Sequence, residues 1–268
     1  MTRFDGGPPQ PFAEHFATLP EIAPQYRPYF WYDWGPVFYR GRLDGSARLL
    51  GIGSDPGPTE RLVGRTLIGD AGQRTQGLLT KIGLTRSYIL VNAYPVAVHP
   101  SNVSQAKPVL SDPQQLAWRN HFYDMLVTPN LEVIVALGAN ASAAVKLWTT
   151  RPNVALFELP HPSNHDETLL LNKWRAALPQ LRAAITPDAD GDPTGPTYGA
   201  TFEESDYQRI PAADLPFGLP PWIGDDSWGR RAQPAHNNCV SRPSTSAQQL
   251  DPDHTLIWQA PTTAQLTH

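Results

Sequence analysis

The sequence of 268 residues contains a single cysteine, Cys239, and this scarcity excludes several classes of protein. One thiol cannot form an intramolecular disulfide, and it cannot supply the ligands of a Cys₄ zinc site or an iron–sulfur cluster. No Glu or second His stands at metal-ligand spacing from another His either. We therefore expect a protein without a cofactor or a bound metal, in the reducing environment of the cytoplasm.

Long apolar runs are also missing from the chain. No stretch of 18 consecutive apolar residues occurs, so we expect no membrane-spanning helix and no membrane partner. The first 25 residues are polar and contain prolines, without the apolar core of a secretory signal, and we therefore expect none.

Charge is unevenly divided along the chain, although the formal net charge is only −4. Residues 1–186 carry 17 Lys and Arg against 14 Asp and Glu, a net charge of +3. Residues 187–268 carry 4 against 11, a net charge of −7. The acidity belongs to the C-terminal third, so the overall charge does not argue against a nucleic acid partner for the first part.

Composition divides the chain at the same place. We predict an α/β domain over residues 1–186 and a proline-rich acidic extension over residues 187–268. The extension has almost no helical or strand periodicity, but it is not poor in large aromatic residues as disordered tails are. These residues are Phe217, Trp222, Trp228 and Trp258. We expect the extension to be a strap that packs these aromatic side chains on the domain, with a solvated tail as the alternative.

Residues 1–186 alternate between apolar runs and helix-like stretches. The four runs that predict buried strands are residues 48–52, 87–91, 132–137 and 154–159. The stretches that predict helices are residues 75–82, 112–126, 139–148 and 168–185. The expected fold class is α/β, a three-layer α/β/α arrangement around a central, mainly parallel four-stranded sheet, followed by the irregular extension. Functional loops of such sheets lie at the carboxyl ends of the strands.

Polar side chains follow two of the predicted strands. The first strand leads into Gly51-Ile-Gly-Ser-Asp-Pro-Gly57, which places Asp55 at the end of a buried strand, although Asp-Pro-Gly is also ordinary turn chemistry. The second strand ends at Asn92, whose amide offers a donor and an acceptor side by side. That pair matches an imide edge, in which C=O and N–H are neighbours. A turn asparagine satisfied by the backbone is the alternative.

A histidine follows the fourth strand, in the segment His161-Pro-Ser-Asn164. The same four residue types recur at His99-Pro-Ser-Asn102, and we expect only one of the two copies to have a functional role. Only the later copy directly follows a predicted strand, and we therefore favour His161. A loop histidine without any role is the alternative.

In this order on an α/β chain, these motifs resemble the uracil-DNA glycosylase superfamily. Its first motif reads GQDPYH in one branch and GEAPG in others, and here Gly53-Ser-Asp-Pro-Gly57 stands in its place. The resemblance covers roughly residues 48–180. Its other parts are Gly64–Asp70, Gly77–Arg86, Asn92, Val135–Ala141 and His161-Pro-Ser163.

The resemblance implies roles for individual residues. Asp55 would position the attacking water and stabilise the cationic sugar, and His161 would donate a hydrogen bond to O2 of uracil. The residues implied in binding the base are Gly53, Ser54, Leu67 and Asn92, with Asn92 reading uracil. The residues expected to contact DNA are Arg65, Ser163, Asn164 and His165, of which Ser163 would bind a phosphate.

The chain also departs from the family pattern. Leu67 stands where relatives carry an aromatic residue that stacks on the base, and Gly57 replaces the tyrosine that blocks the thymine methyl group. The cysteines of the iron–sulfur branches are missing. The motifs are therefore intermediate between branches.

The resemblance implies a monofunctional DNA glycosylase that flips uracil out of single- or double-stranded DNA and hydrolyses its N-glycosidic bond. We expect such an enzyme to act as a monomer in base excision repair. Gly57 and Leu67 enlarge the pocket and motivate a second interpretation, a broader glycosylase for hypoxanthine, xanthine or T·G mismatches. A uracil- or abasic-DNA-binding module with little turnover and an enzyme of free nucleosides are the further alternatives.

Overall fold

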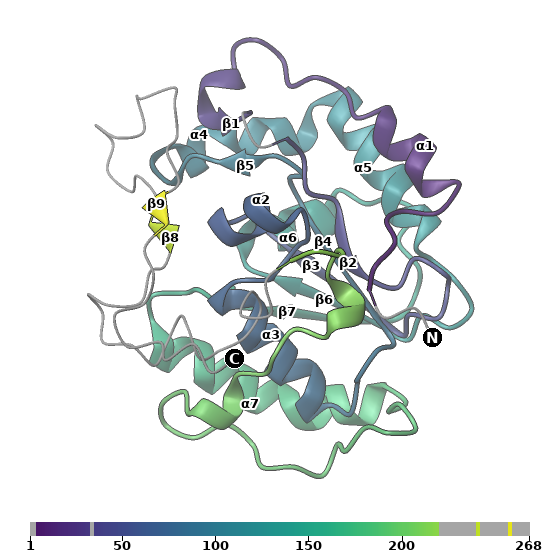
Figure 1. Ribbon diagram of the computed structural model, residues 1–268, viewed down its shortest axis with the longest axis vertical. Coiled ribbons are helices and arrows are strands. Elements are labelled where there is room, and N and C mark those ends of the chain that lie inside the picture. The colour runs from purple at the N-terminus through teal and green to yellow at the C-terminus, as the bar shows by residue number, and fades with distance from the viewer. Residues whose placement is uncertain (1–3, 33–34, 220–239, 242–256, 259–268) are drawn as a thin grey trace.

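The computed structural model describes residues 4–32, 35–219, 240–241 and 257–258. Five strands of the described residues form a central sheet in the order β2-β4-β3-β6-β7 (Figure 1). Their bounds are Tyr39–Gly41 for β2, Leu49–Gly53 for β3, Tyr88–Asn92 for β4, Val133–Leu137 for β6 and Ala155–Leu159 for β7. Strands β3, β4, β6 and β7 run parallel, and β2 is antiparallel to β4. The α/β class and the mainly parallel sheet are confirmed.

The sheet has one strand more than the four that the sequence predicts. Each predicted strand lies within one residue of its expected bounds, and the additional strand is β2 at the sheet edge. Strand β2 has three residues and contains the charged Arg40, so no apolar run marks it in the sequence. Strand β2 forms because its backbone pairs with β4, and this pairing leaves no pattern in the local sequence.

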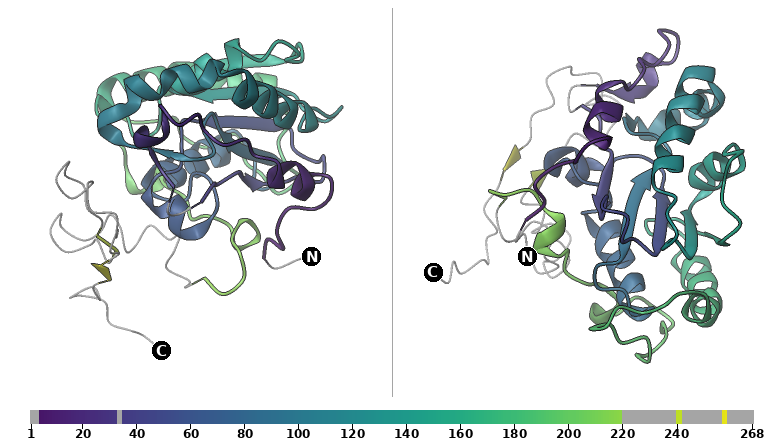
Figure 2. Two further views of the ribbon diagram at one scale, coloured as in Figure 1. Left: turned by 90° about the horizontal axis from the view of Figure 1, so that it is seen from above. Right: turned by 90° about the vertical axis from the view of Figure 1, so that its right-hand side faces the viewer.

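Helices cover both faces of the sheet and complete the three layers (Figure 2). The α-helices of the described residues are α1 Phe12–Ala17, α2 Pro58–Val63, α3 Asp70–Lys81, α4 Val103–Ala106, α5 Pro113–Met125, α6 Ala139–Lys146 and α7 Glu167–Ala184. Helices α1, α5 and α6 pack on one face, and α3 and α7 pack on the other. Among the described residues no helix combines the length and the apolar character that crossing a membrane requires.

The two-residue period of the strands explains why both faces need cover. In β3, Leu50 and Ile52 pack into the cluster beneath α5 and α6, whereas Leu49 packs into the cluster beneath α3 and α7. All five residues of β3, β4 and β6 are buried, as expected for parallel strands between two helical layers.

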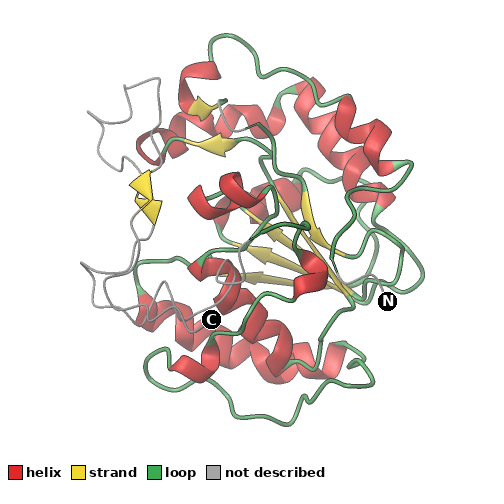
Figure 3. Ribbon diagram, viewed as in Figure 1, coloured by secondary structure: helices red, strands yellow, loops and turns green. Residues whose placement is uncertain are grey.

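The described residues also form smaller elements besides the central sheet and its α-helices (Figure 3). Strands β1 Phe30–Trp31 and β5 Ala97–Val98 form an antiparallel pair, as do β8 Val240–Ser241 and β9 Ile257–Trp258. Short 3₁₀ helices lie at Arg27–Tyr29, Pro100–Asn102, Lys107–Ser111, Glu204–Asp206 and Ala212–Asp214.

Residues 187–219 run from α7 along α3 to the edge strand β2 (Figure 1). They contribute buried carboxylates that contact the domain. Asp188 accepts hydrogen bonds from the backbone N–H groups of residues 85–87, and Asp206 pairs with Lys81 at 2.9 Å. Asp214 is fully buried and contacts Arg40 and Arg42 at 3.2 and 3.0 Å.

Of the aromatic side chains singled out in the extension, only that of Phe217 lies within the described residues, and it does not pack into the domain. Phe217 is 84% exposed, and its ring meets only the edge of Phe4, at 5.4 Å between centroids. Trp222, Trp228 and the side chain of Trp258 lie outside the part of the chain that the structure describes.

Candidate active site

The candidate site lies where the chain reverses its direction of progress across the sheet. From β3 the chain moves outward to β4, and it then crosses back to β6 on the other side of β3. Loops that follow β3 and β6 diverge at such a switch point and leave a crevice at the carboxyl ends of the strands. Here a hydrogen bond joins the loop after β3 to the start of α6, which follows β6, because Asn140 Nδ2 donates to Ser54 Oγ at 2.9 Å.

Asp55 is fixed from two sides. Its Oδ1 accepts a hydrogen bond from Ser54 Oγ at 2.7 Å, and its Oδ2 accepts one from the backbone N–H of Val98 at 3.0 Å. Burial raises the pKa of Asp55 to about 6, and the charge of Glu60 adds to the rise, while the two hydrogen bonds oppose it. The carboxylate is therefore immobilised, largely ionised at neutral pH, and more basic than an exposed aspartate.

Asp55 shares a cleft of about 270 Å³ with His161. The residues that line it are Asp55, Gly57, Pro58, Thr59, Glu60, Leu67, Gly69, Asp70, Ala71, His161 and Ser163. The cleft therefore brings together four of the predicted site residues, Asp55, Leu67, His161 and Ser163.

Leu67 forms part of the cleft wall in an unusual backbone conformation. It is 5% exposed and has φ of 51°, a left-handed conformation that costs about 1 kcal/mol or more in a residue other than glycine. The conformation is held by Glu60, because Glu60 Oε1 accepts hydrogen bonds from the N–H groups of Ile68 and Gly69, at 2.7 and 2.9 Å.

His161 is held as a neutral hydrogen-bond donor. The backbone N–H of Ser163 donates to His161 Nδ1 at 3.2 Å, and Ser163 Oγ lies 2.7 Å from the same nitrogen. An Nδ1 that accepts a backbone N–H carries no proton, so the proton of the neutral ring is on Nε2. Burial lowers the pKa of His161 to about 4, which keeps the ring neutral above that pH.

Asn92 ends β4 directly beside the first motif. It pairs with Gly53 in the sheet, and the hydrogen bonds from Ala93 N to Gly53 O and from Tyr94 N to Ser54 O continue the pairing past the strand ends. A side-chain carbon at Gly53 would lie 2.5 Å from Asn92 Oδ1, so glycine is needed where the asparagine crosses it. Asn92 Nδ2 is buried and has no hydrogen-bond partner among the described residues.

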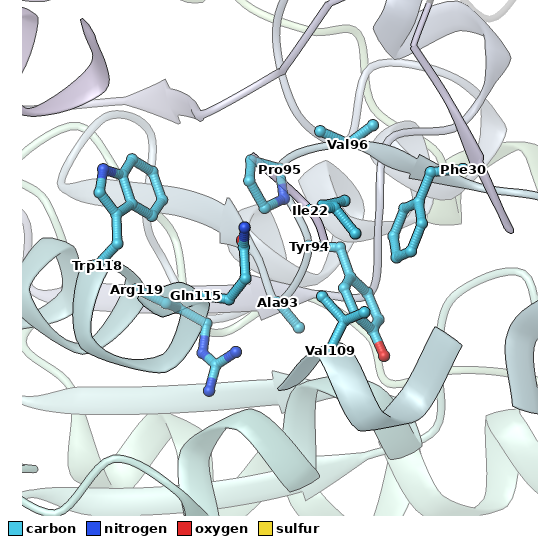
Figure 4. A pocket seen from close by; sticks show the side chains of 10 residues that line it. All are labelled: Ile22, Phe30, Ala93, Tyr94, Pro95, Val96, Val109, Gln115, Trp118 and Arg119. Atoms are coloured by element: carbon cyan, nitrogen blue, oxygen red, sulfur yellow. The ribbon is translucent and has the colours of Figure 1, made fainter. Parts of the chain in front are cut away.

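Residues 93–96, which follow Asn92, pack against α5 around a small space. Figure 4 shows the side chains that line it, with Tyr94 and Val96 on the loop and Gln115, Trp118 and Arg119 on α5. The space they enclose is about 10 Å³, which is room for one water molecule and not for a base. The side chains packed around this space support the loop, and the space is not a candidate ligand site.

Three predicted DNA contacts lie outside the cleft. Arg65 donates to Asp5 at 2.6 Å and stacks over Tyr39, so its guanidinium is engaged within the fold. Asn164 lines a neighbouring hollow of about 470 Å³, which shares His161 and Ser163 with the cleft and also contains Lys173. His165 is exposed and lines neither space.

The earlier of the two His-Pro-Ser-Asn segments, His99–Asn102, is closer to the site than the sequence indicates. His99 directly follows Val98, whose N–H donates to Asp55, and its ring packs against that of Trp31 in a tilted arrangement, at 3.9 Å between centroids. Of the two histidines, only His161 lines the cleft.

Sequence reasoning does not identify Glu60 and Asn140. Glu60 is a buried charge five residues after Asp55, and Asn140 is a buried polar residue within the quoted segment Val135–Ala141. Both are recognised only in the structure, by their burial. Among the described residues no group of three or more His, Cys, Asp or Glu side chains is arranged to hold a metal ion.

No curated protein matches the chain. The family model described as Uracil DNA glycosylase superfamily matches residues 41–182, which span β2 to α7 and contain every residue of the cleft. The chain therefore belongs to the uracil-DNA glycosylase superfamily, whose members act on DNA.

Proposed function

We propose that the protein is a monofunctional uracil-DNA glycosylase that hydrolyses the bond between uracil and deoxyribose after base flipping. Its strongest support is Asn92, an amide buried without a partner for Nδ2 among the described residues. An unsatisfied buried amide costs free energy, and a base that accepts a hydrogen bond there would recover it.

The reaction separates charge, and the two catalytic side chains match the two charges. As the bond from C1′ to N1 breaks, positive charge develops on the sugar and the electron pair moves to the uracil ring. Ionised Asp55 stabilises the sugar cation and takes a proton from the water that attacks C1′. His161 Nε2–H donates to O2 of the departing uracil anion, an interaction worth about 3 to 4 kcal/mol in comparable oxyanion sites.

Asn92 distinguishes uracil from cytosine. Nδ2 can donate to O4 of uracil while Oδ1 accepts from N3–H. Cytosine presents a donor at C4 and an acceptor at N3, which would leave buried polar groups unpaired on both partners.

Glu60 supports discrimination against thymine. A side-chain carbon at Gly57 would meet Glu60 Oε2, so the carboxylate occupies the space that the glycine leaves open. A thymine methyl group directed toward position 57 would press against a buried carboxylate held by two backbone N–H groups. This observation favours uracil over the broader base range.

The DNA strand would continue from the cleft into the neighbouring hollow of about 470 Å³. Ser163 lines both spaces, and Asn164 and Lys173 line the hollow, where Lys173 supplies positive charge. These groups suit a phosphate beside the flipped nucleotide.

A gel assay tests this function. The protein is incubated with single- and double-stranded oligonucleotides that contain U, T·G, hypoxanthine or xanthine, and alkali then cleaves at abasic sites. We expect breaks at U only, and their loss in Asp55→Asn. Asp112→Asn is the matched control, because Asp112 caps α5 outside the cleft and asparagine caps equally well. Affinity for abasic DNA without any break would reject the proposal in favour of a binding module.

A further inference from the structure

Arg74 of α3 links three separate segments of the protein near His161. Its Nη1 donates to the carbonyl oxygen of Pro162 at 2.9 Å. Its Nε and Nη2 both donate to the hydroxyl group of Tyr207, at 3.0 and 2.8 Å. Its Nη2 also lies 3.7 Å from Glu167 Oε2, at the start of α7. The side chain of Arg74 is only 16% exposed, so these contacts are largely shielded from water.

Aromatic rings hold the guanidinium in place. Arg74 Cζ lies 4.2 Å from the ring centroid of Phe202 and 5.3 Å from that of Tyr207. Phe202 is fixed in turn, because its backbone N–H donates to Glu167 Oε1 at 3.2 Å and its ring packs against Trp174 at 6.2 Å. A planar guanidinium fixed by stacking and by directed hydrogen bonds loses little further freedom when it binds a carbonyl group.

The carbonyl group of Pro162 belongs to the same peptide unit as the N–H of Ser163. A peptide unit is planar and trans, so a hydrogen bond that fixes its C=O also fixes the direction of its N–H. That N–H is the donor to His161 Nδ1. Arg74 therefore controls, through one rigid plane, the bond that places the imidazole proton on Nε2.

We propose that Arg74 is a positioning residue for His161, and that Phe202 and Tyr207 from the segment after α7 hold Arg74 in this role. The inference rests on the proposed function, in which His161 Nε2–H stabilises the departing uracil. Without Arg74 the peptide plane can rotate and the imidazole loses its fixed direction. A displacement of about 1 Å in a catalytic group can reduce a rate about 100-fold.

Single-turnover rates and DNA affinities of three variants test the proposal. For Arg74→Ala we expect a rate lower by about 10- to 100-fold with a Kd for uracil-containing DNA within about threefold of the wild type. Tyr207→Phe keeps the ring and removes the acceptor for Arg74, and we expect a smaller decrease in rate. Added guanidinium ion, compared with equal sodium chloride, should partly restore Arg74→Ala.

Arg175→Ala is the matched control. Arg175 donates to the carbonyl groups of Tyr198 and Gly199, so it also ties the segment after α7 to the domain, but it does not contact the His161 loop. We expect its rate to stay within about twofold of the wild type. Equal losses in Arg74→Ala and Arg175→Ala, or an unchanged rate in Arg74→Ala, would overturn the proposal. If Arg74→Ala fails to fold, an unchanged rate in Tyr207→Phe would do so.

Hydrogen exchange separates this inference from the proposed function. In the free protein, we expect the Ser163 amide to exchange faster in Arg74→Ala than in the wild type and Arg175→Ala, because its acceptor is no longer aligned. A wild type without activity on uracil-containing DNA would reject the proposed function, while the exchange rates would still report on Arg74. Unchanged exchange of Ser163 in Arg74→Ala would reject the positioning role.

Discussion

Replacing Asp55 with asparagine should abolish activity and stabilise the fold. Burial raises the pKa of Asp55 from 3.8 to about 6, so the folded protein binds this proton more tightly than the unfolded chain does. A difference of about 2 pKa units corresponds to about 3 kcal/mol, which is the cost of keeping the carboxylate ionised in the folded state at high pH. Asparagine has the same shape and carries no charge.

The hydrogen bonds around Asp55 reduce the expected gain. An asparagine can accept from Val98 N–H with Oδ1 and donate from Nδ2 to Ser54 Oγ, but the hydroxyl proton of Ser54 then loses its acceptor. One such lost bond costs about 1 kcal/mol. We therefore expect Asp55→Asn to increase the free energy of unfolding by about 2 kcal/mol at pH 8.

The pH dependence gives the sharper measurement. The unfolded chain ionises near pH 3.8 and the folded protein near pH 6, so wild-type stability falls with rising pH across this window and the asparagine variant lacks this fall. Urea unfolding should show a stability gain about 1.4 kcal/mol larger at pH 8 than at pH 5. A gain independent of pH, or a variant less stable than the wild type at pH 8, would refute the reasoning. The wild-type rate should rise with pH through about 6.

Three further substitutions have defined outcomes. Asn92→Ala should lower kcat/KM for uracil-containing DNA by about 100-fold or more in steady-state assays, because its donor and acceptor are both lost. Glu60→Ala should raise the T·G to U activity ratio in the oligonucleotide assay, because space opens beside Gly57, and an unchanged ratio would contradict this role. Asp214→Ala should lower the free energy of unfolding by about 3 to 5 kcal/mol in urea titrations, because Arg40 is left buried and unpaired.

The sequence predicts the sheet core because buried strands leave local patterns, and four of the predicted site residues, Asp55, Leu67, His161 and Ser163, line the cleft. An apolar run of five residues identifies β3 or β6 without any tertiary information, and the polar residue after β3 or β4 must lie at the carboxyl edge. Asp55, Asn92 and His161 follow from this rule together with the family resemblance. Their protonation does not, because it depends on burial and on the N–H of Ser163.

Contacts between distant segments account for what the sequence misses. Strand β2 exists through its pairing with β4, and Arg65 finds Asp5 sixty residues earlier in the chain. The rings that contact Arg74 beside the His161 loop are those of Phe202 and Tyr207, in a segment without periodicity. Such side chains are found only when the partner surface is known.

Ion pairs between the two parts of the chain change the interpretation of its uneven charge. The positive surplus of residues 1–186 is not a free basic surface, because several of its cations already contact carboxylates of the segment after α7. The pairs are Arg40 and Arg42 with Asp214, Arg48 with Asp188 and Lys81 with Asp206. Asp188, Asp206 and Asp214 thus neutralise part of the positive charge of residues 1–186. The proposed phosphate contacts would then depend on directed groups beside the cleft, such as Ser163 and Lys173, rather than on the overall charge.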